Sequence, residues 1–232
     1  MLLLPGDLVA PDRARLTGRR FEHVREVHRA KAGDDLAVGL LGGAMGRGRV
    51  LRLEDGVLEL DLCLDQAPPP KLPLTLVLAV PRPKVLNRVV AAAASLGVAR
   101  LVLLNAWKVE KAYWASPKMK PDNLHEQLLL GLEQAKDTVL PELRLARLFR
   151  PFVEDELPAL LAGGTGLMAH PGTGRTAHTV LTSPITLAIG PEGGWIDAEV
   201  QSLLDAGLQP LDLGPRILRT ETALAALVGK LF

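Results

Sequence analysis

The sequence predicts an α/β fold with a largely parallel sheet, preceded by a small β-barrel. After residue 73, short apolar runs alternate with stretches of helical periodicity, which is typical of strand–helix–strand units. Before residue 68, apolar residues alternate with period two between glycine turns, which indicates short antiparallel strands. A stiff run of prolines at 68–70 separates these patterns, so we expect domains at 1–70 and 71–232.

The elements follow from local signals. In the first domain, apolar residues alternate over 36–40 and 58–64, and Asp55-Gly56 predicts a hairpin turn before the second run. In the second domain, Gly97 ends a helix, and Asn123 with Glu126 has the pattern of a helix N-cap. The predicted strands are 74–80, 98–104, 143–148, 167–169, 185–189 and 211–213, and the predicted helices are 84–96, 123–135, 152–161 and a last one through 224–231.

Composition excludes several classes of protein. The 232 residues are 48% hydrophobic and carry a net charge of +1, which argues neither for nor against nucleic acid as a partner. A single cysteine, Cys63, excludes an internal disulfide and fits a reducing compartment. There is no signal-peptide pattern and no apolar run of membrane-spanning length, so we expect a cytoplasmic protein without a membrane partner. The five histidines lack ligand spacing, so we expect no metal.

Two glycine loops are the strongest functional signal. Gly190-Pro-Glu-Gly-Gly194 follows the apolar run 185–189, and Gly214-Pro215 follows 211–213. Either loop alone is typical of a tight turn between a strand and a helix. Together they offer close backbone approach and free amides, which an adenosine-type cofactor needs. Arg216 and Arg219 beside the second loop are unusual for a purely structural turn.

A third loop, His170-Pro171-Gly172, also follows a strand, and ligands of parallel sheets bind beyond the carboxyl ends of the strands. The segment 172–177 fits the dinucleotide pattern G-x-G-x-x-A, but the residues after it form a poor helix, which argues against nicotinamide or flavin. No segment matches the phosphate loop G-x-x-x-x-G-K-[ST], which argues against an NTPase.

The residues 190–194 and 213–222 resemble the two signature loops of the bacterial 16S ribosomal RNA uridine-N3 methyltransferases, a family of the SPOUT class of S-adenosylmethionine enzymes. Weaker likeness extends over most of the chain: Arg20-Phe21, 23–29, Gly33-Asp34, Gly97-Val98, Glu133-Gln134, Pro141 and His170-Pro171. The chain departs from the family pattern at Glu26, Ser95, Asn105 to Lys108 and Asp137. These departures lie outside the cofactor loops and leave the exact RNA target open.

The resemblance implies a trefoil-knotted methyltransferase domain, a PUA-like N-terminal barrel that binds RNA, a homodimer, and 16S rRNA or the small ribosomal subunit as partner. It implies S-adenosyl-L-methionine as the cofactor, with backbone groups of the loops around its adenine and methionine parts. The implied cofactor-binding residues are His170, Ile189, Gly190, Pro191, Glu192, Gly193, Gly194, Leu213, Gly214, Ile217, Leu218, Arg219, Thr222 and Ala223.

For catalysis, Arg219 is the candidate that stabilises negative charge on the uracil oxygens, and Glu192 or Glu221 is the candidate proton acceptor. Each glutamate has the alternative role of fixing a loop or a helix N-terminus. Between residues 11 and 31 the chain has seven basic and three acidic residues. The candidate RNA-binding residues there are Arg13, Arg19, Arg20, His23, Arg25, Arg29 and Lys31, the alternative being an ordinary solvated face.

Three other functions stay open at this stage. The same fold can methylate another RNA or another base position. It can also serve as a non-catalytic RNA-binding factor in ribosome assembly, although the complete cofactor loops argue against this. A small-molecule α/β enzyme is a third alternative, against which the basic N-terminal domain argues.

Overall fold

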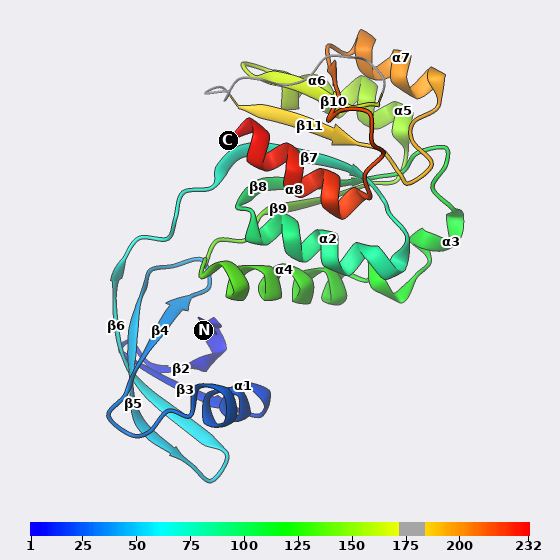
Figure 1. Ribbon diagram of the computed structural model, residues 1–232. Coiled ribbons are helices and arrows are strands. Elements are labelled where there is room, and N and C mark those ends of the chain that lie inside the picture. Colours follow the sequence, from blue (N-terminus) through cyan, green and yellow to red (C-terminus); the bar gives the residue numbers. More distant parts are fainter. Residues whose placement is uncertain (172–183) are drawn as a thin grey trace. The chain divides into compact units, whose positions relative to one another are not determined.

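The computed structural model describes residues 1–171 and 184–232 (Figure 1). The dinucleotide-like pattern at 172–177 and His178 therefore lie outside the described residues. The chain forms two compact units, which we describe separately. The N-terminal unit comprises Met1–Pro69 and Leu132–Leu140, and the C-terminal unit comprises Pro70–Gly131 and Pro141–Phe232.

Residues 132–140 pack with the N-terminal unit, although sequence analysis assigned them to the second domain. Thr138 explains this placement. Its hydroxyl donates a hydrogen bond of 2.6 Å to the carbonyl oxygen of Gly43, and its own carbonyl oxygen accepts one of 2.7 Å from the amide of Gly42. Both hydrogen bonds join a buried threonine to residues far away in the sequence, so no local sequence pattern predicts them.

The N-terminal unit contains a six-stranded mixed sheet in the order β1-β4-β5-β6-β3-β2. Only the β1–β4 pair is parallel. The predicted Asp55-Gly56 hairpin is confirmed: it joins β5 to β6, and both residues have positive φ, 52° and 76°. The pairing establishes a sheet, and its closure into a PUA-like barrel stays a prediction. The elements of this unit are β1 Leu2–Leu3, η1 Pro5–Asp7, β2 Leu8–Ala10, β3 Arg13–Thr17, α1 Arg19–His23, η2 Val24–His28, β4 Asp35–Leu40, β5 Met45–Glu54 and β6 Val57–Gln66.

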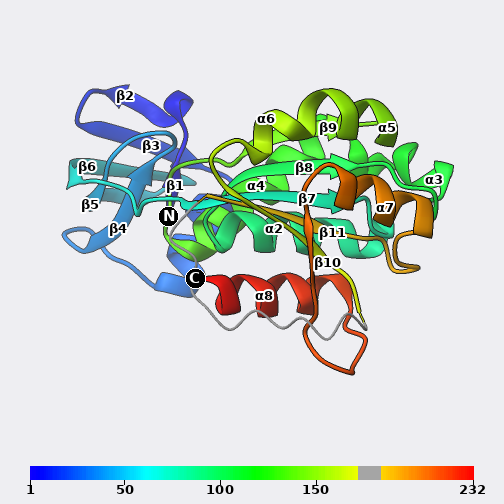
Figure 2. The same cartoon turned by 90° about the horizontal axis from the view of Figure 1, so that it is seen from above.

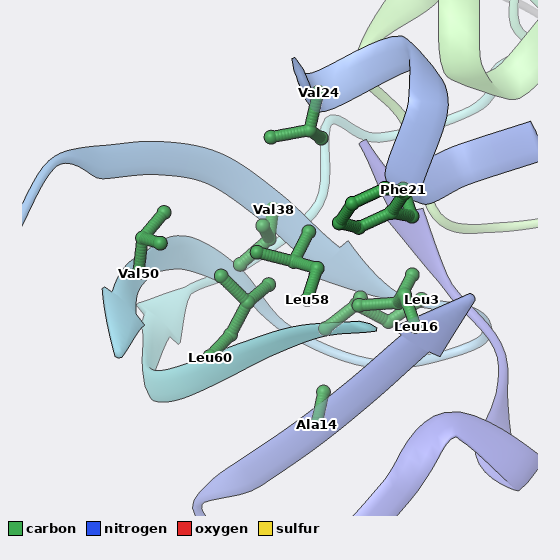
Figure 3. Packing of buried hydrophobic residues seen from close by; sticks show 9 residues of the cluster. All are labelled: Leu3, Ala14, Leu16, Phe21, Val24, Val38, Val50, Leu58 and Leu60. Atoms are coloured by element: carbon green, nitrogen blue, oxygen red, sulfur yellow. The ribbon is translucent and has the colours of Figure 1, made fainter. Parts of the chain in front are cut away.

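The core of the N-terminal unit lies between this sheet and the helical segment α1–η2. Phe21 and Val24 of that segment are 2% and 0% exposed. Figure 3 shows their side chains close to those of Leu3, Leu16 and Val38 from the strands. The basic residues of 19–29 are therefore carried by a short helical segment whose other face is apolar and buried.

The C-terminal unit contains a six-stranded parallel sheet in the order β12-β10-β11-β7-β8-β9. Its strands are β7 Leu72–Ala79, β8 Val98–Leu104, β9 Glu142–Ala146, β10 Thr165–Ala169, β11 Ile185–Ile189 and β12 Gln209–Leu211. The predicted parallel α/β sheet is confirmed. The last strand begins and ends two residues earlier than predicted, because the chain turns at Asp212, whose carboxylate accepts the amide of Gly214 at 2.6 Å.

Helices cover both faces of this sheet: α2 and α8 lie on one side, and α5 and α6 on the other (Figure 2). The bounds are α2 Pro83–Ser95, α3 Lys111–Trp114, η3 Pro117–Met119, α4 Pro121–Ala135, α5 Phe149–Pro151, η4 Phe152–Glu156, α6 Leu157–Leu161, α7 Asp197–Asp205 and α8 Thr220–Leu231. Gly97 follows α2 with φ of 76°, as predicted. The predicted N-cap at Asn123 is wrong: α4 begins at Pro121, and the Asn123 amide donates to Asn87 Oδ1 and the Lys118 carbonyl.

Within the described ranges, no helix is long and apolar enough to cross a membrane. The same residues contain no group of histidine, cysteine or carboxylate side chains arranged to hold a metal ion.

Candidate functional site

The carboxyl ends of all six parallel strands lie at one edge of the sheet. The three loops for which the sequence predicts ligand binding follow strands at this edge. Ala169 at the end of β10 pairs with Ile189 of β11 on one side and with Leu211 of β12 on the other. The two glycine loops are consecutive along the chain but are not neighbours in the sheet. His170 follows the strand between them, and its amide donates to the Leu211 carbonyl at 3.0 Å.

The loop after β11, residues 190–194, is a tight turn closed by the Gly194 amide, which donates to the Pro191 carbonyl at 2.7 Å. Gly194 has φ of 71°, which favours glycine. A β-carbon on Gly190 would lie only 3.1–3.2 Å from the indole ring of Trp195. The backbone of Gly190 therefore packs directly against the indole ring of Trp195.

Trp195 is a buried support for this loop that sequence analysis missed. It is 5% exposed, and its ring centroid lies 6.1 Å from that of Phe149. Its indole Nε1 is buried without a hydrogen-bond partner among the described residues. An unpaired buried donor is costly and therefore uncommon, so it marks this position as one of special constraint.

The loop is also held from the ends of β7 and β8. The Lys108 ammonium donates to the carbonyl oxygen of Gly193 at 2.7 Å, and the Arg82 amide donates to Glu192 Oε1 at 3.0 Å. Lys108 belongs to the segment 105–108, where the sequence departs from the family pattern, and it places a cation at this loop. Partial burial and the hydrogen bond to Glu110 raise the pKa of the nearby Tyr113.

Glu199 of α7 also holds the segment after β8 in place. Its carboxylate is 5% exposed and accepts the amides of Trp107 at 2.7 Å and Ile196 at 3.1 Å. One buried side chain thereby fixes both the start of α7 and the chain after β8.

Replacing Glu199 by alanine is expected to lower the free energy of unfolding by about 3 kcal/mol, since two backbone donors lose their charged acceptor. Urea denaturation followed by circular dichroism measures this. Glu126→Ala, at an exposed position of α4, is the matched control and should change stability by less than about 0.5 kcal/mol. Equal urea denaturation midpoints for the two variants would show that Glu199 does not stabilise the fold.

The loop after β12 is exposed and open. Gly214 has φ of 105°, and residues 215–219 are all exposed, with Ile217 at 87%. The amides of Ile217 and Leu218 donate no hydrogen bond within the described part of the chain. Leu213 and Ala223 are half-buried and Thr222 is exposed. This loop therefore presents free backbone donors at the sheet edge.

Arg219 and Glu221 flank the start of α8 but differ in their partners. Arg219 precedes the first residue of the helix, is exposed, and forms no ion pair with the described residues. Glu221 Oε1 lies 3.3 Å from Arg88 Nη2 and so connects α8 to α2. Glu192 and Glu221 thus both have structural partners, which supports their alternative role of fixing a loop or a helix N-terminus, while Arg219 has no ion-pair partner among the described residues.

Ion pairs divide the basic candidates of the N-terminal unit. Arg20 donates to both carboxylate oxygens of Asp7, at 2.5 and 2.6 Å, and Arg25 pairs with Glu22 and Glu26. The remaining cationic side chains form no ion pair with described residues; they are Arg13, Arg19, Arg29 and Lys31. These four are the cations left available to phosphates.

A cavity of about 690 Å³ lies within the N-terminal unit beside the α1–η2 segment. Its walls include Arg19, His23, His28 and Lys136. The rings of the two histidines meet edge to face with centroids 5.0 Å apart, and burial together with His23 lowers the pKa of His28. This cavity could not be predicted from the sequence, because its walls come from segments far apart along the chain.

The departures from the family pattern have local partners. Ser95 Oγ donates to the Ala92 carbonyl, Asn105 Oδ1 accepts the indole N–H of Trp114, and Asp137 Oδ1 accepts the amides of Thr138 and Val139. These residues stabilise turns and loops in this chain.

The fold and its loops define an α/β methyltransferase. A family model described as RNA methyltransferase domain matches residues 68–231, and the chain belongs to this family. A protein of Treponema pallidum named ribosomal RNA small subunit methyltransferase E is 30% identical over 213 residues, covering 89% of this chain and 80% of its own length. The Synechocystis protein of that name is 29% identical, with coverages of 90% and 69%.

Solved structures agree with this membership. A putative methyltransferase of Legionella pneumophila, in complex with the bound cofactor SAM, matches with a TM-score of 0.75 and 25% identity over 99% of this chain and 96% of its own. A ribosomal RNA small subunit methyltransferase E of Neisseria gonorrhoeae, bound to S-adenosyl methionine, matches with a TM-score of 0.77 and 20% identity over 98% and 94%. These structures share the fold, and the family model and the named relatives confirm the predicted family.

Proposed function

We propose that this protein transfers a methyl group from S-adenosyl-L-methionine to N3 of a specific uridine in the 16S rRNA of the small ribosomal subunit. The observation that carries the proposal is the meeting of the loops after β10, β11 and β12 at one sheet edge. The proposal includes a trefoil knot in the C-terminal unit, a PUA-like barrel in the N-terminal unit, a homodimer and a cytoplasmic location.

The residues present fit the cofactor. Trp195 occupies the space beside Gly190, Gly194 and Gly214 have positive φ, and the amides of Ile217 and Leu218 donate no hydrogen bond within the described part of the chain. Such a surface admits a ligand close to the backbone and offers it donors. Together with His170, Ile189, Leu213, Thr222 and Ala223, these loops would hold the adenine, ribose and methionine parts.

When bound, S-adenosylmethionine supplies an electrophilic methyl group on a sulfonium. N3 of uridine carries a proton, which must leave as the nitrogen becomes the nucleophile. The guanidinium of Arg219, which forms no ion pair with the described residues, would stabilise the negative charge that then spreads over the uracil oxygens. Glu192 or Glu221 would accept the proton, and the target base must leave its stack to reach the loops.

The decisive experiment is nucleoside mass spectrometry of rRNA from cells with and without the protein. Loss of one N3-methyluridine from 16S rRNA is the expected result and identifies RNA, base and atom together. A methyl lost from another nucleotide would instead support the alternative of the same chemistry on another target. Unchanged rRNA together with no uptake of S-adenosylmethionine in calorimetry would support a non-catalytic assembly factor and refute the proposal.

RNA binding through the N-terminal unit should depend steeply on salt. If Arg13, Arg19, Arg29 and Lys31 each neutralise a phosphate, log K should fall with log salt at a slope of about −3 on single-stranded RNA. Arg13→Ala should lower the steepness by about 0.7. Filter binding between 50 and 200 mM salt measures this, with Arg52→Ala, whose guanidinium already pairs with Glu54 and Asp55, as control. A flat salt response would leave the cluster without a role in RNA binding.

A further inference from the structure

Trp107 is a large aromatic side chain presented to solvent beside the proposed cofactor loops. It is 79% exposed. It follows β8, which pairs with β7, and β7 in turn pairs with β11, whose carboxyl end carries the loop 190–194. The adjacent Lys108 donates to the Gly193 carbonyl at 2.7 Å. Trp107 is therefore one residue along the chain from a direct contact with that loop.

The backbone around Trp107 is fixed from three directions. Its amide donates to the buried carboxylate of Glu199 at 2.7 Å. The preceding Ala106 is 4% exposed, and its carbonyl accepts the Val109 amide at 3.0 Å. The tryptophan is thus an exposed ring on an anchored backbone, so a planar ligand that stacks on it orders little additional chain.

The loop that carries Trp107 also carries lysines that can meet an anionic partner. Lys108 and Lys111 follow Trp107 within four residues, and Lys111 forms no ion pair within the described residues. The carboxylates of Glu110, Glu192 and Glu199 already accept protein donors, from the Tyr113 hydroxyl, the Arg82 amide and the Trp107 amide respectively. An exposed aromatic ring with lysines on the same loop is the kind of surface on which single-stranded nucleic acids stack their bases.

We propose that Trp107 stacks on an unpaired base of the substrate RNA close to the nucleotide that is methylated. The inference rests on the proposed function and adds to it an RNA-binding residue outside the cofactor loops and outside the N-terminal basic cluster. Because every base has a π-face, Trp107 selects single-stranded RNA over duplex and contributes affinity more than base identity.

The test uses a fluorescein-labelled octauridylate and the full-length protein at 50 mM salt. Trp107→Ala should weaken binding of the probe about tenfold, and Trp107→Phe should restore it to within about threefold of the wild type, since the smaller ring still stacks. Leu148→Ala, at a position 65% exposed after the neighbouring strand β9, is the matched control and should leave binding unchanged. Calorimetry with S-adenosylmethionine should give the same affinity for all four proteins.

Analytical ultracentrifugation of the same proteins separates RNA from a protein partner. Unchanged probe binding in Trp107→Ala, with a shift from dimer to monomer, would overturn the proposal and make Trp107 a subunit contact. Unchanged probe binding with an unchanged oligomeric state would overturn it as well. If the wild type binds the probe through Trp107 but takes up no S-adenosylmethionine, methyl transfer fails as the function and the stacking site stands.

Discussion

Replacing Arg219 by alanine is expected to slow methyl transfer about 10²–10³-fold while leaving affinity for S-adenosylmethionine within about threefold of the wild type. Its guanidinium forms no ion pair with described residues and stands directly before α8, at the sheet edge that carries the glycine loops. A preorganised charge that acts only on the developing anion changes the barrier and not the binding of the donor. Loss of one such group typically costs about 10²–10³-fold in rate, measured here by single-turnover methylation at saturating cofactor and RNA.

Arg216→Ala is the matched control for this variant, because Arg216 is exposed in the same loop. We expect it to retain turnover within about threefold. Arg219→Lys keeps the charge but lacks the planar fork, so it should recover part of the rate. Full turnover in Arg219→Ala would remove this residue from the chemistry, and a parallel loss of cofactor affinity would assign it to the cofactor instead.

The strands of the C-terminal unit could be predicted from sequence because a buried parallel strand is an apolar run. The run at 185–189 is such a case, and β11 has these bounds in the structure. The predicted ends of strands and helices were wrong where a side-chain hydrogen bond determines them. The Asp212 carboxylate caps the turn after β12, and the polar contacts of Asn123 lie with Asn87 and Lys118 instead of the helix end.

Strand order could not be predicted in the same way. The insertion of β10 between β11 and β12 depends on pairing between segments far apart in the sequence, and periodicity carries no information on it. The supports of the site share this property. The side chains of Lys108 and Glu199 bind backbone atoms of Gly193 and Trp107, and the ring of Trp195 packs against Gly190. Such contacts leave no spacing pattern in the sequence.

The basic cluster shows the opposite error, in which composition overstates the available charge. Sequence alone counts Arg20 and Arg25 with the other cations, but Asp7, Glu22 and Glu26 neutralise them in the fold. Asp7 comes from a different element, η1, so its pairing with Arg20 is not visible in the local charge pattern. The prediction on RNA binding therefore rests on the four candidates that form no ion pair with the described residues, which are Arg13, Arg19, Arg29 and Lys31.

Replacing Gly190 by valine is expected to weaken binding of S-adenosylmethionine about 30- to 150-fold. The added β-carbon alone would approach the Trp195 ring to 3.1 Å, and the branched side chain needs still more room. Trp195 is buried and packs near Phe149, so the loop 190–194 has to move instead of the ring. A displaced loop misaligns about two backbone hydrogen bonds to the cofactor, roughly 2–3 kcal/mol, which isothermal titration calorimetry measures.

Two further variants decide whether the clash with Trp195 is the cause. Gly229→Val places the same side chain on the exposed face of α8, where no atom lies within 4 Å, and should leave cofactor affinity unchanged. Adding Trp195→Phe to Gly190→Val exchanges the indole for a smaller ring and should restore most of the affinity, because the space needed by the valine becomes available. If the double variant binds as weakly as Gly190→Val alone, steric pressure on Trp195 does not position this loop, and the coupling between the two residues is refuted.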